Sequence, residues 1–173
     1  MKKSLLDASS AILLFKTGLC EQLFEVYQVF ITESVFNELT QSERPGKIEF
    51  QEWLADNRFS VIPVHEEGAL QKVRRSQFSG LDRGEADTIR SFEKGYADFI
   101  LTDDGRAAGY CKKNAIPFIN GLLVPKVLCF SHKISADTCN NKMEFLINIG
   151  RYSERIITWA IDCPRESLDF FLS

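Results

Sequence analysis

Two short apolar segments end in aspartate, SLLD at residues 4–7 and FILTDD at residues 99–104. Short apolar runs that lead into a turn or helix are typical of buried parallel strands. In open α/β sheets, catalytic groups gather at the carboxyl edge, where such strands end. Carboxylates meeting there would repel each other unless a positive charge lay between them. The two segments therefore predict a parallel sheet with an acidic edge suited to a divalent metal.

The strand and helix patterns between these segments alternate along the chain. We expect strands at residues 4–6, 28–31, 59–64, 99–102 and 117–120. We expect helices at 9–16 (with a serine as N-cap), 20–27, 33–39, around 53–54, and at 66–77, 81–94 and 106–113. Repeated β-α-β order predicts a three-layer α/β/α fold with a central parallel sheet of four to five strands.

From residue 122 onward the apolar pattern becomes wholly helical, with helices expected at 122–130, 137–149 and 154–161. No linker, repeat or low-complexity run separates this part from the rest of the chain. We therefore divide the chain into an α/β domain at 1–121 and a helical extension at 122–173 that packs on the same domain.

Size and composition favour one soluble domain with a sizeable core. The chain has 173 residues, of which 45% are hydrophobic and 26% charged, and a net charge of −3. That charge gives no whole-protein attraction to nucleic acid, although a local basic surface remains compatible with it. No apolar stretch approaches the roughly 18 residues of a membrane span. The aspartate at position 7 comes too early for a signal peptide, so we expect a cytoplasmic protein without a membrane partner.

The five cysteines are odd in number and form no C-x-x-C pair. This pattern argues against a disulfide framework or a zinc site and favours reduced, core-packing thiols. The two histidines, His65 and His132, lie outside the acidic motifs and are expected to be structural. No Walker A loop, H-E-x-x-H motif or nucleophilic serine elbow is present, which weakens nucleotidase, protease and esterase hypotheses.

Acidic residues follow the strands or open the helices at several points of this pattern. Asp7 ends the first strand, Glu38 lies in the helix after the second, Glu85 opens a later helix, and Asp103 and Asp104 end the fourth strand. All these points fall on one edge of a parallel sheet. Several carboxylates there match the incomplete oxygen coordination that Mg²⁺ or Mn²⁺ accepts, with water filling the remaining positions.

Three of these acids have structural alternatives. Asp7 could cap the first helix, although Ser9 and Ser10 could also do so, and Glu38 alone could be an ordinary surface residue. Glu85 has the strongest alternative, because Asp82 and Glu85 have the spacing of a capping box.

The aspartate doublet leaves a choice open. Asp103 and Asp104 are adjacent, so at most one is expected to point at a metal while the other caps the helix at residues 105–106. Asp87 is expected to be a first-turn carboxylate favoured by the helix dipole, with metal-side support as its alternative role.

The segments LLDASSAI (5–12), VFNEL (35–39), GEADTI (84–89) and LTDDGRA (101–107) together resemble a PIN-domain protein in order and spacing. The closest resemblance is to a prokaryotic branch related to toxin nucleases. It implies Asp7, Glu38, Glu85 and Asp104 as catalytic, metal-binding acids, with Asp103 as the rival for the last place. It also implies Ser9 or Ser10 and Thr102 as polar residues lining the site.

The resemblance implies a metal-dependent ribonuclease that hydrolyses phosphodiesters with metal-activated water. Single-stranded RNA is the favoured substrate on family grounds, and an antitoxin-like protein or a second copy of the chain would be the protein partners. Cations near the acidic edge are needed to contact phosphate. Arg106 is the preferred candidate, and it belongs to a cluster with Lys112 and Lys113. A second cluster comprises Lys72, Arg74 and Arg75.

Two other functions compete with the nuclease. The first is a non-catalytic PIN-fold module that binds or oligomerises through its helical extension, although it would not need all four acids. The second is a receiver-type phosphorylation switch, which needs two acids after the first strand and a lysine after the last. Here Asp7 is single and Asn120 follows the last strand, so this alternative ranks lowest.

Overall fold

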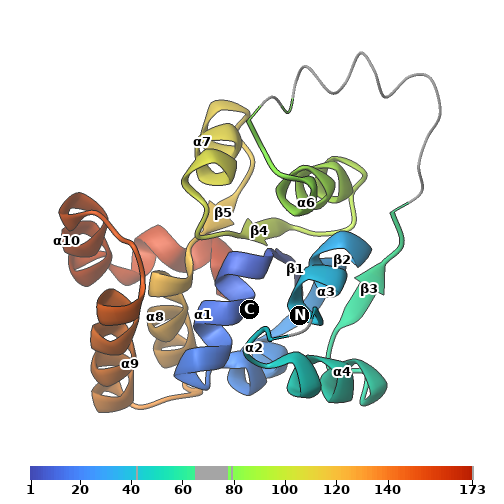
Figure 1. Cartoon of the computed structure of the whole chain (residues 1–173). Coiled ribbons are helices and arrows are strands. Elements are labelled where there is room, and N and C mark those ends of the chain that lie inside the picture. The colour runs from blue at the N-terminus through green and yellow to red at the C-terminus, as the bar shows by residue number, and fades with distance from the viewer. Residues whose placement is uncertain (42, 65–77, 79, 173) are drawn as a thin grey trace.

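The computed structural model describes residues 1–41, 43–64, 78 and 80–172, and these form a three-layer α/β/α fold (Figure 1). All pairings within its five-stranded sheet are parallel, in the order β3-β2-β1-β4-β5. The strands are β1 (Lys2–Leu6), β2 (Tyr27–Thr32), β3 (Ser60–Ile62), β4 (Phe99–Leu101) and β5 (Phe118–Ile119). The predicted fold class is confirmed, with β1 at the centre of the sheet.

Helices cover both faces of this sheet because successive strand residues point to opposite sides. On one face, α1 (Ala8–Thr17) and α2 (Cys20–Val26) share a core with Leu6 and Leu101. On the other face, α6 (Arg83–Glu93) and α7 (Gly105–Lys113) pack over Leu5 and Ile100. Helix α3 (Glu33–Leu39) contacts both α1 and α6, and α4 (Lys47–Ala55) precedes β3. Figure 1 shows α6 and α7 above the strands and α1 and α2 below them.

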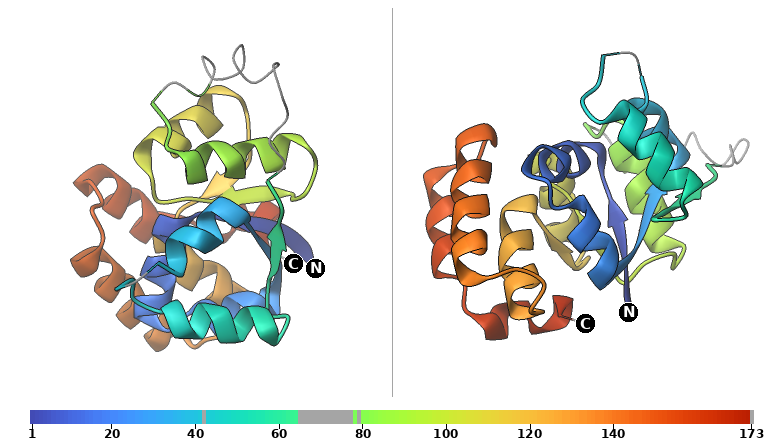
Figure 2. Two further views of the ribbon diagram at one scale, coloured as in Figure 1. Left: turned by 45° about the vertical axis from the view of Figure 1, so that its right-hand side comes forward. Right: turned by 90° about the horizontal axis from the view of Figure 1, so that it is seen from below.

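The chain after β5 is helical and packs beside α1 and α2 (Figure 2). It comprises the 3₁₀ turn η1 (Gly121–Leu123), α8 (Val124–Phe130), α9 (Ala136–Ile149), α10 (Glu154–Asp162) and the 3₁₀ segment η2 (Arg165–Phe171). Its residues Leu128, Met143, Leu146 and Leu168 are buried in the same core cluster as Leu6 of β1. The tail helices thus complete the apolar layer on one side of the sheet.

Two of the differences from the expected helix boundaries have a clear physical reason. Helix α1 begins at Ala8, and its N-cap is Asp7 rather than a serine, because the Asp7 carboxylate accepts the Ser10 backbone N–H at 2.8 Å. The helix expected at 122–130 is divided, since η1 is capped by Asn120 and α8 starts only at Val124. Pro125 lies in the first turn of α8, where a missing N–H costs nothing.

Part of the prediction lies outside the described residues. This applies to the helix expected at 66–77, to His65, and to the cationic cluster of Lys72, Arg74 and Arg75. Among the residues that are described, no helix is both long and apolar enough to cross a membrane. All five cysteines are free thiols, and four of them are buried, as expected.

Candidate active site

The site begins where the two central strands end side by side. In the register of β1 and β4, Leu6 pairs with Leu101, so the residues that follow both strands are neighbours. The Asp7 backbone N–H extends this pairing by donating to the Leu101 carbonyl oxygen at 3.1 Å. Parallel pairing therefore brings Asp7 together with Thr102 and the aspartate doublet, although 95 residues separate Asp7 from Thr102.

Asp7 is a buried carboxylate surrounded by hydrogen-bond donors. Its Oδ1 accepts the Ser9 hydroxyl at 2.9 Å and the Ser10 backbone N–H at 2.8 Å, and its Oδ2 accepts the Thr102 hydroxyl. Burial raises the pKa of Asp7 to about 6, with a smaller contribution from the nearby charge of Asp103, although the three hydrogen bonds act against that rise. A buried acid of this kind is costly to ionise unless a cation joins it.

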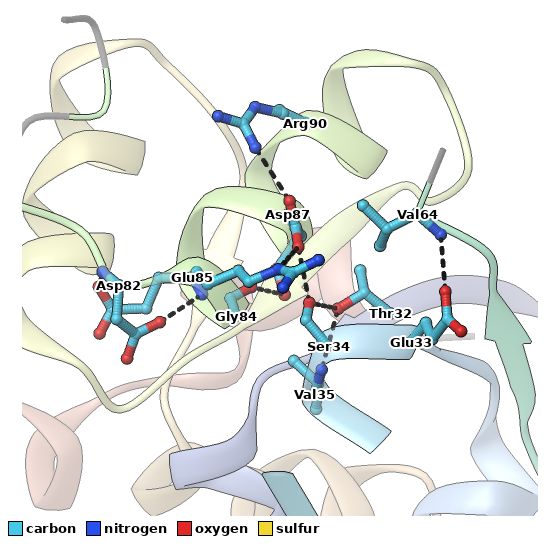
Figure 3. Close-up of polar contacts among 12 residues, drawn as sticks. Thr32, Glu33, Ser34, Val35, Val64, Asp82, Gly84, Glu85, Asp87 and Arg90 are labelled. Carbon is cyan, nitrogen blue, oxygen red and sulfur yellow. Dashed lines mark hydrogen bonds and ion pairs between the residues drawn. The ribbon is translucent and has the colours of Figure 1, made fainter. Parts of the chain in front are cut away.

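Glu85 is both a helix cap and a site residue. Asp82 Oδ1 accepts the Glu85 N–H at 2.8 Å, and Glu85 Oε2 accepts the Asp82 N–H at 3.0 Å, which completes the capping box (Figure 3). Burial, followed by the neighbouring charges of Asp82 and Asp104, raises the pKa of Glu85 to about 7. The structural alternative considered for Glu85 is thus realised, while its carboxylate also faces the Asp104 side of the site.

Glu38 reaches the site from the last turn of α3. Its Oε1 lies 3.3 Å from Nη2 of Arg44, and the Glu38 side chain is about one-third exposed. Gly84, at the start of α6, lies close by, because a Cβ added to it would be 3.7 Å from Glu38 Oε2. The absence of a side chain at Gly84 therefore leaves room between Glu38 and the capping box.

The two aspartates of the doublet have different surroundings. Asp104 is the N-cap of α7, where its Oδ1 accepts the N–H groups of Arg106 and Ala107 at 2.7 and 3.0 Å. Asp103 lies nearer the interior, and its carboxylate accepts the Ser10 and Tyr152 hydroxyls, each at 2.6 Å, and the Gly121 N–H. Burial raises the pKa of Asp103.

The four predicted acids lie around one pocket of about 490 Å³. Asp7, Glu38, Glu85 and Asp104 all line it, together with Ser9, Asp82 and Gly84. They come from the end of β1, the end of α3, the start of α6 and the start of α7. Asp103 and Thr102 are not among the described lining residues of this pocket, and they approach it through their hydrogen bonds to Ser10 and Asp7.

Among the described residues, the cations that line this pocket differ from the preferred candidate, Arg106. Arg44 and Arg151 line it, whereas the guanidinium of Arg106 donates to the Gly80 carbonyl oxygen at 2.7 Å. Arg44 lies in the turn-rich loop before α4, and Arg151 lies in the tail just before α10. Neither position carries a local sequence motif, so only their distance in space from the acids could identify them.

Asp87 is a buried acid that links α3 with α6 through hydrogen bonds and an ion pair. It is 3% exposed, and its carboxylate accepts the Ser34 hydroxyl at 2.8 Å and pairs with Arg90 at 2.9 Å (Figure 3). Ser34 is in turn 3.0 Å from the hydroxyl of Thr32, the N-cap of α3. This chain of contacts joins the first turn of α3 to α6, and these helices carry Glu38 and Glu85. Glu85 is the acid in the first turn of α6 and Asp87 lies beyond that turn, so the expectation that Asp87 is a first-turn carboxylate was wrong.

The donor set of the pocket suits a hard divalent cation, because Mg²⁺ and Mn²⁺ prefer oxygen ligands. Burial, and to a smaller extent the neighbouring acids, raises the pKa of Asp7 and of Glu85, and a bound cation would offset this cost of ionisation. Within the described part of the chain, no three His, Cys, Asp or Glu side chains are already gathered around one ion position. The residues fit the cation by chemistry, while Glu85 and Asp104 are engaged in helix caps and Glu38 is paired with Arg44.

An open parallel sheet with an acidic pocket at its carboxyl edge defines an α/β domain with a candidate cation site. The family model described as a PIN domain matches residues 3–160 of the chain. The protein therefore belongs to the PIN-domain family, whose members are generally nucleases that use divalent metals. Among curated proteins, no match to the chain was found.

Proposed function

We propose that this protein is a cytoplasmic ribonuclease that hydrolyses RNA phosphodiester bonds with Mg²⁺ or Mn²⁺ held by Asp7, Glu38, Glu85 and Asp104. The observation that carries the proposal is the meeting of these four carboxylates at one pocket from four separate elements. When bound, the cation would supply an activated water for attack on phosphorus and offset charge on the phosphate oxygens. The five free thiols are consistent with a reducing compartment.

The protein's own groups have defined tasks in this proposal. Ser9 and Thr102 orient the Asp7 carboxylate through their hydroxyl groups, so its direction is set before substrate arrives. Arg44 and Arg151, on the wall of the same pocket, are available to contact phosphate oxygens. Acids at the base and guanidinium groups beside them would hold a phosphodiester against the cation.

The test is cleavage of an end-labelled single-stranded RNA by the purified protein with Mn²⁺ or Mg²⁺, with EDTA as the blank. Asp7→Asn and Glu38→Gln should reduce cleavage to the blank rate. Glu49→Gln is the matched control, because Glu49 is exposed on α4 and is not among the described lining residues of this pocket. Wild-type cleavage by Asp7→Asn would refute this site, and equal cleavage of a DNA of the same sequence would refute the preference for RNA.

A second candidate function is a non-catalytic module that binds an antitoxin-like protein or a second copy of the chain. Exposed apolar residues on α9 favour it, since Phe145 is 45% and Ile149 36% exposed. Calorimetric titration with Mn²⁺ separates the two functions, because a module without catalysis has no need of the cation. Light scattering during gel filtration, alone and with the product of any adjacent small gene, tests the two partners.

A further inference from the structure

A second hollow of about 690 Å³ adjoins the acidic pocket. Its walls include residues of α7, β5 and α10, among them Lys112, Phe118, Arg155, Ile156 and Trp159. Arg151 and Asp104 line both hollows, so the second one opens beside the acids. We call this second hollow the α7–α10 groove.

The cations of the α7–α10 groove form no ion pairs with other described residues. Lys112, Arg151 and Arg155 are exposed, and within the described residues none of the three makes an ion pair or a side-chain hydrogen bond. The acids near them are already engaged or lie elsewhere. The wall residue Asp103 is half-buried and accepts hydrogen bonds from three donors, and the wall residue Asp104 caps α7. Glu154 is exposed in the first turn of α10 and is not a described wall residue. The groove therefore presents positive charge to solvent.

The same groove displays an aromatic surface. Trp159 is 52% exposed and Ile156 39% exposed, and both lie on the α10 wall, within one turn of Arg155. A tryptophan of this kind leaves a large apolar ring face in water. Cations that track a phosphate backbone, combined with an exposed aromatic ring on which a base can stack, are the features of single-strand nucleic-acid binding.

We infer that the α7–α10 groove binds a single-stranded nucleic acid, with a base stacked on Trp159 and phosphates on Lys112, Arg151 and Arg155. The inference rests on the proposed function, because the groove would hold the rest of the RNA strand when the phosphate to be cleaved lies at the acids of the first pocket. Arg151 stands at the junction of the two hollows. A paired strand cannot offer a free base face to Trp159, so the groove selects unpaired RNA.

Binding is measured by fluorescence anisotropy of a labelled RNA of about 12 nucleotides, a length within the range that single-strand folds bind. EDTA prevents cleavage during the measurement. Trp159→Ala should weaken binding by about tenfold, the lower part of the range for loss of one stacked base. Lys112→Ala and Arg155→Ala should each lower the slope of log affinity against log salt by about 0.7.

Matched controls come from exposed residues outside the groove. Lys16→Ala removes an exposed charge in the last turn of α1, and Tyr96→Ala removes a ring that is 44% exposed before β4. Both controls should bind RNA as the wild type does. A Trp53→Phe variant leaves Trp159 as the only tryptophan, and RNA should then quench its fluorescence.

The outcomes separate this inference from the proposed nuclease. RNA binding that depends on Trp159 without any metal-dependent cleavage supports the groove and refutes the nuclease. Cleavage by the wild type with unchanged affinity in all three groove variants refutes the groove and leaves the nuclease standing. Equal binding of a duplex refutes the stacking, and a change of oligomeric state in Trp159→Ala with unchanged RNA binding identifies a protein interface instead.

Discussion

The burial of Asp7 predicts that removing its charge will stabilise the metal-free protein while abolishing cleavage. Asp7 is 3% exposed and its pKa is raised to about 6. The substitution Asp7→Asn keeps the size of the side chain and its role as N-cap, because asparagine caps helices as well as aspartate does. The amide can still accept the Ser10 N–H and contact Thr102. Only the buried charge is lost.

The magnitude follows from linkage. A rise in pKa from 3.8 to about 6 corresponds to about 3 kcal/mol, taken as an upper limit. Since the native state holds the Asp7 proton more tightly than the unfolded state, ionisation penalises the native state. The stabilising contribution of the protonated acid is complete below pH 3.8 and is lost as the pH rises through about 6. The free energy of unfolding of Asp7→Asn should therefore be higher than that of the wild type by up to about 3 kcal/mol at pH 8, and by little at pH 4.

Urea unfolding followed by circular dichroism in EDTA, at pH 8 and at pH 4, measures this difference. The matched control is Asp56→Asn, an exposed aspartate at the end of α4, which should change the free energy of unfolding by less than about 0.5 kcal/mol. Added Mn²⁺ should stabilise the wild type by mass action and leave Asp7→Asn unchanged. The reasoning fails if Asp7→Asn is less stable than the wild type at pH 8, or if the difference is the same at both pH values.

Three further substitutions test the contacts that hold the site. Tyr152→Phe removes one donor from the half-buried Asp103 carboxylate and should cost about 1–3 kcal/mol of unfolding free energy in urea titrations; an unchanged midpoint would contradict the hydrogen bond. Gly121→Ala places a Cβ 2.6 Å from Asp103 Oδ2, so it should lower thermal stability by about 1–3 kcal/mol, and a neutral effect would show that this carboxylate moves freely. Ser34→Ala takes a hydroxyl from buried Asp87 and should cost about 1–3 kcal/mol by the same assay, whereas stabilisation would mean that Arg83 and Arg90 satisfy that acid without it.

The sequence predicts the elements of this fold well because their signals are local. An apolar run such as residues 99–101 followed by aspartates marks a strand end, and Asp82 with Glu85 marks a helix start. Of the caps that the sequence left open for α1, Asp7 is the one that forms, because its backbone is extended and its carboxylate accepts the Ser10 N–H, whereas Ser9 and Ser10 lie inside the helix. The strand order β3-β2-β1-β4-β5 is set by packing between distant segments, which no local pattern reports.

The residues missing from the predicted site share one cause. Arg44, Arg151 and Tyr152 come from a loop and from the tail, and they reach the acids only after the chain has folded. A single arginine or tyrosine in such segments carries no motif. The doublet shows the same limit, since its two aspartates are adjacent in sequence and yet one caps α7 while the other is held by Tyr152.

The hydrogen bond between Tyr152 and Asp103 also constrains how this protein can diverge. The two residues are 49 positions apart, and both side chains are half-buried. A lineage that loses the tyrosine hydroxyl leaves a half-buried carboxylate short of a donor, and one that loses the carboxylate leaves a half-buried hydroxyl without this acceptor. Both positions should therefore change together among relatives, so that the tail and the acidic edge are inherited as one unit.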